Sequence, residues 1–214
     1  MAYATGGSPV KHITGASAPV STHPMTVAIF GNPDNTTEVH ESVAIINTES
    51  NSVGTHLYFA GGTDGNPIWF QVKESAGGNS CDAKTTVSFS AAAWNHAAGV
   101  AVSASSHAAF RNGANKGTTS NTISYPTMSK FSIGYRYPGD VYPFNGYVAE
   151  CALWNTALTD AEIESLAKGF SPRRIRPQSL VFYAPLLRNL QDLRQGLALT
   201  AVNSPTVASH PRVY

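Results

Sequence analysis

The sequence predicts an all-β fold, an antiparallel β-sandwich with one short helix. Short runs in which every second residue is apolar recur along the chain, and this period of two is typical of strands buried on one face. Glycine, asparagine and proline separate the runs about every ten residues. A helical period of apolar residues is found at 159–168. The length of 214 residues suits one large β domain.

Residues 1–24 are expected to form an extended N-terminal arm, and 25–214 the single sandwich domain. The arm is rich in small polar residues and contains Pro9, Pro19 and Pro24. Proline has no amide hydrogen and interrupts regular elements. Such an arm either frays or lies along a neighbouring subunit.

Strands are expected along the middle of the chain, with short turns between them. Asn112-Gly113 is the strongest hairpin signal, because both residues tolerate the positive φ angles of a type I′ turn. Residues 76–82 are expected to be a loop. The expected strands are 25–30, 42–47, 55–60, 68–73, 85–89, 94–103, 107–111, 116–121 and 131–135.

The most strongly patterned stretch is a strand followed by the helix, in residues 144–169. Thr159 and Glu162 have the spacing of a capping box, and Gly169 suits the C-terminal cap, so the helix is expected over 159–168. In the strand, period two predicts one face made of Tyr147, Ala149, Cys151 and Leu153, and an opposite face made of Val148, Glu150, Ala152 and Trp154.

Several of these segments resemble one known family. FNGYVAECALWNTALTDAEIESLAKG is similar to the closing segment of laminin-G-like domains of the concanavalin A-like lectin/glucanase superfamily. MTVAIFGNP, FSAAAWNHAAGVAVSASSHAAFRNGANKGTT and FSIGYR are similar to earlier segments, in family order from Met25 to about Phe170. The resemblance implies a concanavalin A-like jelly roll. It implies little about function, because the superfamily contains lectins, enzymes, adhesion modules and virus-particle proteins.

Residues 178–214 are expected to supply strands that complete the sandwich. SLVFYAPLLRNLQDLRQGLALTAVNSPT, residues 179–206, resembles the segment that normally starts such a domain. We therefore expect a circular permutation, in which C-terminal strands take the place of N-terminal ones. Sheet neighbours are set by pairing and not by chain order, so the sandwich closes either way.

The composition argues against a nucleic-acid partner and against a membrane span. The net charge is +1, from 14 Lys and Arg against 13 Asp and Glu, whereas a protein that tracks phosphates carries a basic excess. No apolar run reaches the length of a membrane span, and the start lacks the order of a secretory signal. The chain is therefore expected to be made in a cytoplasm, with Cys81 and Cys151 as free thiols.

Catalytic and metal-binding candidates are few. Laminarinase-type members of the superfamily place catalytic carboxylates as E-x-D-x-x-E on a strand, and this sequence has no such motif. Asp160 and Glu162 are explained by the start of the helix. No pair of histidines has metal-ligand spacing and no G-x-S-x-G elbow occurs, so we expect a non-enzyme without a cofactor. Calcium is the alternative, through turn residues with oxygen ligands: Asp34, Asn35, Asp64, Asn66 and Asp140.

Two clusters are predicted to contact a partner or a glycan. The first is the aromatic loop of Tyr135, Tyr137, Tyr142 and Phe144. Exposed aromatic side chains stack on sugars or anchor protein interfaces, and local packing of the loop is the alternative. The second is the basic linker of Arg173, Arg174 and Arg176. It is either a solvated linker or a contact with an acidic partner subunit.

Two functions follow from the sequence. The first is a non-enzymatic virion protein, most of all a capsid decoration protein of a tailed bacteriophage, because the whole pattern resembles stand-alone laminin-G-like proteins of phage particles. It would bind the major capsid protein or sibling copies through the arm, as a homo-oligomer or in a large assembly. The second is a carbohydrate-binding module for host surface glycans, with Tyr137 and Tyr142 as stacking platforms. A glycosidase is a distant third.

Overall fold

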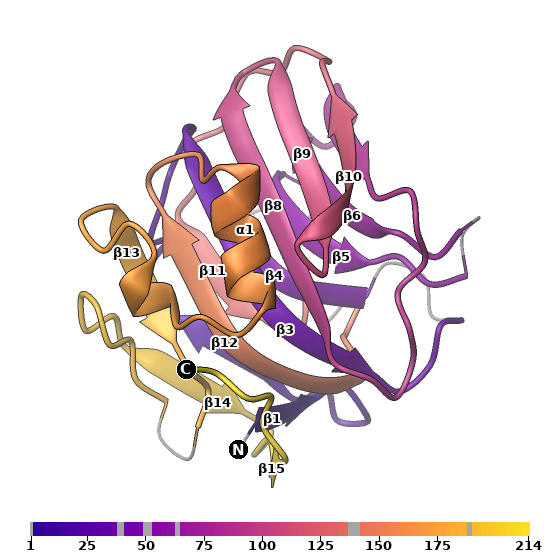
Figure 1. Ribbon diagram of the computed structural model, residues 1–214, viewed down its shortest axis with the longest axis vertical. Helices are drawn as coiled ribbons and strands as arrows, with labels where there is room; N and C mark the ends of the chain where they lie inside the picture. The colour runs from indigo at the N-terminus through magenta and orange to yellow at the C-terminus, as the bar shows by residue number, and fades with distance from the viewer. Residues whose placement is uncertain (1, 38–40, 49–52, 63–64, 137–141, 188–189) are drawn as a thin grey trace.

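Two antiparallel β-sheets pack face to face, and one α-helix covers part of the outer face of one sheet (Figure 1). The structure is a computed structural model, and it describes residues 2–37, 41–48, 53–62, 65–136, 142–187 and 190–214. The two layers and the single short α-helix in this part of the chain confirm the predicted sandwich.

The eight-stranded sheet consists, in spatial order, of β10 (Ala114–Thr119), β9 (Ser106–Arg111), β8 (Asn95–Ser103), β3 (Met25–Pro33), β12 (Gly146–Trp154), β1 (Ala2–Thr5) and β15 (Val207–Ala208), with β13 (Leu180–Ala184) also paired to β12. The seven-stranded sheet consists of β14 (Leu199–Val202), β2 (His12–Gly15), β11 (Lys130–Ile133), β4 (Glu41–Asn47), β5 (Gly54–Phe59), β6 (Ile68–Lys73) and β7 (Ser80–Lys84). Neighbouring strands are antiparallel throughout these pairs, as expected.

Apolar side chains from both inner faces fill the space between the sheets. Phe59, Phe70, Phe131 and Phe182 are fully buried there, and the rings of Phe131 and Phe182 lie 4.8 Å apart. Burying a side chain of this size contributes about 1.5–3 kcal/mol. The inner faces are therefore occupied by packing, and any binding surface lies on an outer face or at an edge.

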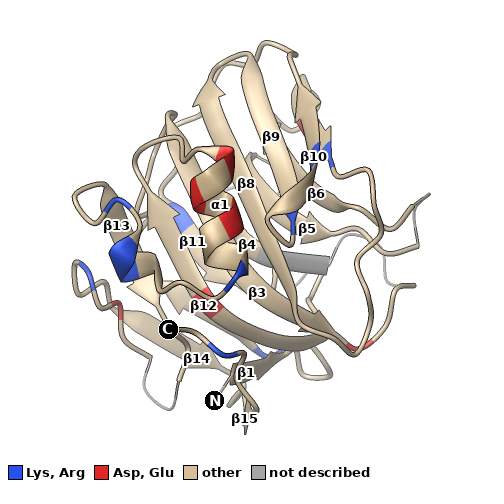
Figure 2. Cartoon of the chain, viewed as in Figure 1, with Lys and Arg blue, Asp and Glu red and all other residues tan. Residues whose placement is uncertain are grey.

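Helix α1 (Asp160–Ala167) has the caps that the sequence predicted. The Thr159 side chain accepts from the Glu162 backbone, and the Glu162 carboxylate accepts from the Thr159 amide at 2.7 Å. Gly169 has φ +89° and its amide donates to the Leu166 carbonyl. Ile163 and Leu166 pack on the outer face of the eight-stranded sheet. Figure 2 shows that acidic residues are spaced along this helix.

Strand β12 does not keep the two faces that period two predicted. Between Ala149 and Ala152 it advances three residues while β3 advances two, which is a β-bulge, and Glu150 has φ +57°. Val148 therefore shares the inner face with Cys151 and Leu153, which the alternation had placed opposite it. The extra residue shifts every later side chain to the other face, and period-two counting does not detect it.

The N-terminal segment is part of the sandwich, and the prediction of an extended arm over residues 1–24 is wrong. Strand β1 pairs with both β12 and β15, and β2 pairs with β11 and β14. Ala2 and Ile13 are fully buried. Each strand has four residues, which is too short for its alternation to stand out among glycines and prolines.

The region after β6 also differs from expectation. Residues 80–84 form β7, although 76–82 was expected to be a loop, and 85–89 does not form the expected strand. Cys81 and Ala83 face the core and alternate with Ser80 and Asp82. The glycine and asparagine residues before β7 led to the loop prediction.

The C-terminal segment contributes to both sheets. Strand β13 pairs with the second half of β12, while β1 pairs with its first half, so the two strands share one edge of β12. Strand β14 pairs with β2, and β15 pairs with β1. Residues from both ends of the sequence thus lie side by side (Figure 1). The circular permutation stays a prediction.

Candidate functional site

Two cross-strand rows of polar and aromatic side chains lie on the outer face of the seven-stranded sheet. On β6, Ile68, Phe70 and Val72 face the core, so the residues between them face outward. The strand registers place Tyr58, Trp69 and Lys84 in one row. They place His56, Gln71 and Asp82 in the next row. We call these six residues the sheet-face cluster.

The Asp82 carboxylate holds the cluster in one orientation. It accepts hydrogen bonds from Trp69 Nε1 at 3.2 Å, from Gln71 Nε2 at 2.8 Å and from Ser80 Oγ at 2.8 Å. A hydrogen bond to a charged acceptor is stronger than one between neutral groups. The indole of Trp69 therefore stands in a fixed position on the sheet.

Trp69 is partly exposed. Its neighbours on the adjacent strands are the cationic Lys84 and the aromatic Tyr58. Lys84 Nζ lies 4.3 Å from the centroid of the indole, and the ring of Tyr58 lies 5.7 Å from it. A cation over an indole face is attracted by its electrons. The row thus combines an apolar plate with a cation over one of its faces.

A buried hydrogen-bond chain links two members of the cluster, Tyr58 and His56, to Arg136. Arg136 Nη1 donates to the Tyr58 hydroxyl at 3.2 Å, and that hydroxyl lies 2.7 Å from His56 Nδ1. His56 Nδ1 also lies 3.4 Å from Gln71 Oε1, so this nitrogen contacts both Tyr58 and Gln71. His56 Nε2 is buried and has no hydrogen-bond partner in the described part of the chain.

Of the three hydrogen-bonded side chains Arg136, Tyr58 and His56, only Arg136 carries a charge. Burial, with a further effect of the Arg136 charge, lowers the pKa of His56 to about 3. Burial raises the pKa of Tyr58 to about 12. Both groups are therefore neutral at neutral pH. Arg136 also lies over the Tyr142 ring, with Cζ 4.4 Å from its centroid.

The predicted aromatic loop contributes one described side chain to this surface. Tyr142 is 36% exposed and has φ +53°. Tyr137 lies outside the described residues. Tyr135 and Phe144 are buried, so their prediction as contact residues is wrong: Tyr135 packs with its ring 3.6 Å from that of His12, and Phe144 packs against Phe59. Both face inward because the strands beside them bury this end of the sandwich.

The predicted basic cluster is divided by the structure. Arg176 Nε bonds the Glu162 carboxylate at 2.6 Å and so ties the linker to α1. Arg173 and Arg174 are exposed in the 3₁₀ helix η1 (Pro172–Arg174). The three arginines therefore do not act as one patch.

The residues of the sheet-face cluster were missed in the sequence. IWFQVK was assigned as a strand, but its outward residues were not considered as a site. The signal was present: Trp69, Gln71 and Lys73 alternate with three core residues, and a tryptophan among polar residues on one face is unusual for a solvated face. Their partners on β7 were hidden because that strand was expected to be a loop.

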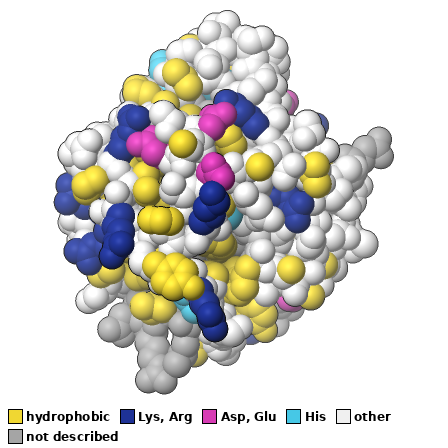
Figure 3. All heavy atoms as spheres, viewed as in Figure 1, with side chains coloured by type: hydrophobic (Ala, Val, Ile, Leu, Met, Phe, Trp, Pro, Cys, Tyr) yellow, Lys and Arg dark blue, Asp and Glu magenta, His cyan; other side chains and the backbone are white. Residues whose placement is uncertain are grey.

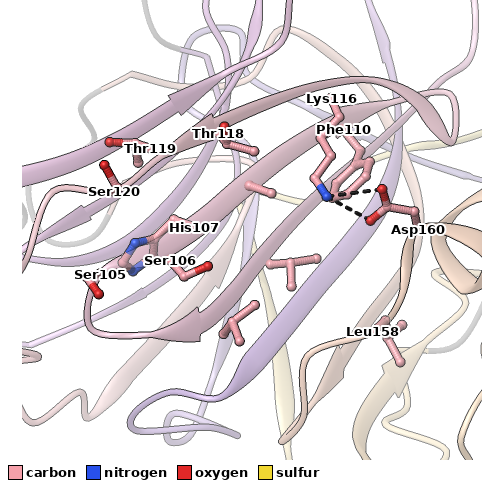
Figure 4. Close-up of a pocket in the computed structure, with 13 residues that line it drawn as sticks. Ser105, Ser106, His107, Phe110, Lys116, Thr118, Thr119, Ser120, Leu158 and Asp160 are labelled. Carbon is pink, nitrogen blue, oxygen red and sulfur yellow. Dashed lines mark hydrogen bonds and ion pairs between the residues drawn. The ribbon is translucent and has the colours of Figure 1, made fainter.

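A hollow lies between α1 and the strands β8–β10 (Figure 4). Its volume is about 370 Å³, and serine and threonine hydroxyls line one end of it: Ser105, Ser106, Thr118, Thr119 and Ser120. At the other end, Lys116 and Asp160 pair at 2.9 Å over the buried Phe110. Lys116 and Asp160 pair with each other, and the ring of Phe110 is buried beneath them. The hollow is therefore less suited to binding a ligand than the sheet-face cluster.

Metal ligands do not converge in the described part of the chain. No three His, Cys, Asp or Glu side chains there lie close enough to hold an ion. Asp64 and Asp140, two of the calcium candidates, fall outside the described residues. Cys81 and Cys151 are buried free thiols. His96 is buried and packs its ring 5.0 Å from that of Phe30.

A sequence model of the concanavalin A-like lectin/glucanases superfamily, Laminin_G_3, matches residues 5–164. The chain belongs to this superfamily. The match begins in β1, ahead of Met25 where the resemblance was first noted, and ends within α1. The matched range thus includes β2 and the last residue of β1. A search of curated protein sequences found no match.

Solved structures share the fold of this superfamily member. A heptameric SAP-like pentraxin from Limulus polyphemus has a TM-score of 0.66 at 15% identity, with 98% of this chain and 94% of the pentraxin covered. Domain 4 of the arabinanase AbnA from Geobacillus stearothermophilus, solved with arabinotriose, has a TM-score of 0.57 at 20% identity, with coverage of 77% and 80%.

A bacteriophage protein is also similar in fold. The enzymatically active domain of tailspike protein 2 of bacteriophage CBA120 has a TM-score of 0.60 at 12% identity, with 86% of this chain covered. The chain spans 31% of that tailspike chain. At these identities the likeness concerns the lectin-type fold alone. No helix among the described residues is long and apolar enough to cross a membrane.

Proposed function

We propose that this chain is a non-catalytic carbohydrate-binding module and that the sheet-face cluster binds the sugar. The observation that carries the proposal is a partly exposed Trp69 whose indole is fixed by Asp82 beside Gln71 and Lys84. The arabinanase domain solved with arabinotriose supports it as a fold that occurs with a sugar ligand.

The chemistry of the cluster matches that of a sugar ring. The apolar face of a pyranose or furanose packs on an indole, while its hydroxyls both donate and accept. Asp82 accepts three hydrogen bonds but offers about four lone-pair sites, so it has capacity for a sugar hydroxyl. Gln71 adds a donor beside the indole, and Lys84 adds a cation over one of its faces.

The same geometry argues for binding without catalysis. Retaining glycosidases need two carboxyl groups about 5–5.5 Å apart, and inverting ones need a wider pair. Within the sheet-face cluster Asp82 is the single carboxylate, and its oxygens orient Trp69 and Gln71. No hydrolysis step is proposed for it.

The test is a glycan array followed by calorimetric titration of the best-binding glycan. Trp69→Ala removes the apolar plate, and we expect its affinity to fall about tenfold or more. The matched control is Trp94→Ala, which removes another partly exposed tryptophan, located just before β8 in the other sheet. Circular dichroism checks that both variants keep the fold. An array without binding, or equal affinities for the two variants, would rule the site out.

A virion role is a second candidate. The likeness to the phage tailspike domain supports it, at the level of fold. The arm that was expected to bind the shell is instead folded into the sandwich, so particle binding would need an outer surface. Co-sedimentation with phage heads and tails tests it. Saturable binding at a fixed copy number supports a structural role. Protein that stays in the supernatant with both kinds of particle contradicts it.

A further inference from the structure

A pocket of about 580 Å³ lies where the C-terminal segment crosses the end of β13, away from the sheet-face cluster. Its walls are mostly apolar and include Pro185, Leu187, Leu193 and Tyr214. Figure 3 shows hydrophobic side chains beside Lys and Arg side chains on the face that carries α1. Ligand pockets are concave, mainly apolar and contain a few convergent polar groups, and this pocket has all three properties.

The polar floor of the pocket is a buried carboxylate with two partners. Glu150, at the bulge of β12, is 5% exposed. Its Oε2 accepts from the Tyr183 hydroxyl at 2.6 Å, and its Oε1 lies 3.1 Å from His210 Nε2. Hydrogen bonds to Glu150 and to backbone carbonyls raise the pKa of His210 despite its partial burial. His210 in its protonated form neutralises the Glu150 charge.

Two arginines at the rim have no acidic partner. Arg173 and Arg212 both line the pocket, and neither forms an ion pair within the described part of the chain. Both are exposed. Since Glu150 and His210 compensate each other, the side chains of the lining carry a net positive charge from these two guanidinium groups. A guanidinium binds a carboxylate through two parallel hydrogen bonds.

We propose that this pocket is a second binding site, for a small organic carboxylate that carries an apolar or aromatic group. The carboxylate pairs with Arg173 and Arg212. The apolar part lies against Leu187, Leu193 and Tyr214. The exposure of these three side chains, 42%, 42% and 69%, leaves apolar surface available to the ligand. The proposal is independent of the sugar site, because it uses other residues, the other sheet and another ligand class.

Binding at this site depends on pH through the floor of the pocket. The titratable and charged groups that face it are Glu150 of β12, Tyr183 of β13, Arg173 of η1, and His210, Arg212 and Tyr214 of the C-terminal segment. When His210 loses its proton above pH 6.5, the Glu150 charge is no longer compensated and repels the ligand carboxylate. Affinity is therefore expected to fall as the pH rises through the pKa of His210.

The test is a titration of ¹⁵N-labelled full-length protein with benzoate, followed by amide chemical shifts. Benzamide is the matched neutral probe. We expect saturable shifts around Ser171, Tyr183 and Val213 with benzoate below about 20 mM, and no saturable shift with benzamide. The double variant Arg173→Gln/Arg212→Gln should weaken benzoate binding about tenfold or more. Arg174→Gln, a change in the neighbouring exposed arginine that does not line the pocket, should leave it unchanged.

Several results would overturn the proposal. One is the absence of saturable shifts with benzoate, and another is equal binding of benzamide. A third is unchanged benzoate affinity in the double variant, which would place the carboxylate elsewhere. An affinity that is constant from about pH 6 to about pH 9 would contradict the role of Glu150 and His210 on the floor. None of these results depends on whether Trp69 binds a sugar.

Discussion

Three buried imidazoles stay neutral in the folded chain. Burial lowers the pKa of His56 to about 3 and of His96 to about 3, and burial together with the charge of His23 lowers that of His107 to about 4. Each ring has a buried nitrogen without a hydrogen-bond partner in the described part of the chain. Protonation of any of these rings creates a buried charge that water does not solvate, and this costs free energy.

Stability is therefore expected to fall as the pH decreases from 6.5 toward 4. In that window an unfolded histidine, with a pKa near 6.5, takes up a proton that the folded one does not, so protons favour the unfolded state. With three histidines the free energy of unfolding falls by up to about 4 kcal/mol per pH unit. Above pH 6.5 this contribution is fully present. Urea denaturation at several pH values, followed by tryptophan fluorescence, measures the slope.

His96→Gln isolates one of the three sites. The variant removes one titrating group from the core, so the slope should decrease by about 1.4 kcal/mol per pH unit even if the variant is less stable at neutral pH. An unchanged slope would show that His96 is not among the groups that cause the acid sensitivity.

At the scale of elements, the edge strand β10 of one sheet packs closely against the edge strand β7 of the other. Gly117 of β10 packs against the backbone of β7, and a Cβ added there would overlap the Lys84 carbonyl. The neighbour is backbone and cannot move as a side chain would. A glycine at this position thus lets the open edges of β10 and β7 cover each other.

Gly117→Ala is expected to lower the free energy of unfolding by about 1–3 kcal/mol, because overpacking forces the backbone apart. Gly77→Ala is the matched control: a Cβ at Gly77 has no neighbour within 4 Å, and its φ is not positive. Thermal unfolding by circular dichroism compares the two. Equal melting temperatures would mean that the edges are not in contact in solution.

The strongly patterned elements agree with expectation, and the weakly patterned ones do not. Strand β6 has the predicted bounds, Asn112 and Gly113 have φ +52° and +74° as a type I′ turn requires, and α1 has its predicted caps. Local sequence determines each of these. The bulge at Glu150 depends on pairing with β3, which local alternation does not report.

The candidate site was hard to predict for a related reason. Trp69 and Asp82 are thirteen residues apart in the sequence and become neighbours through the registers of β6 and β7. Period two indicates which residues face outward, but the register decides which of them meet. Tyr142 was predicted because it lies in a dense aromatic stretch, and the structure places it against Arg136.

At the scale of the whole molecule, both ends of the sequence hold the sandwich together. Strands β1 and β13 divide one edge of β12 between them, and β2 lies between β11 and β14. Phe182 of β13 and Ile13 of β2 are fully buried in the common core. Neither end is an appendage to a domain that is complete without it.

Truncation at either end is expected to abolish cooperative folding. The fragment 1–172 lacks β13 and exposes the edge of β12, and the fragment 25–214 lacks β1 and β2. Each loses fully buried side chains worth about 1.5–3 kcal/mol apiece, against a typical total stability of about 5–15 kcal/mol. Soluble expression and thermal unfolding test this. A cooperative transition in 25–214 would restore the idea of a separable arm.

The pairing of β1 with β15 determines how the sandwich responds to mechanical force. Ala2 lies opposite Ala208 and Tyr3 opposite Val207, so the two chain ends leave this pair of strands on the same side. Tension applied between the ends first meets the hydrogen bonds of Tyr214 with Gly169 and Ser171, and then loads the β1–β15 bonds one after another. The C-terminal segment should therefore detach first and this seam open next, while the long β3–β12 pairing at the centre still holds.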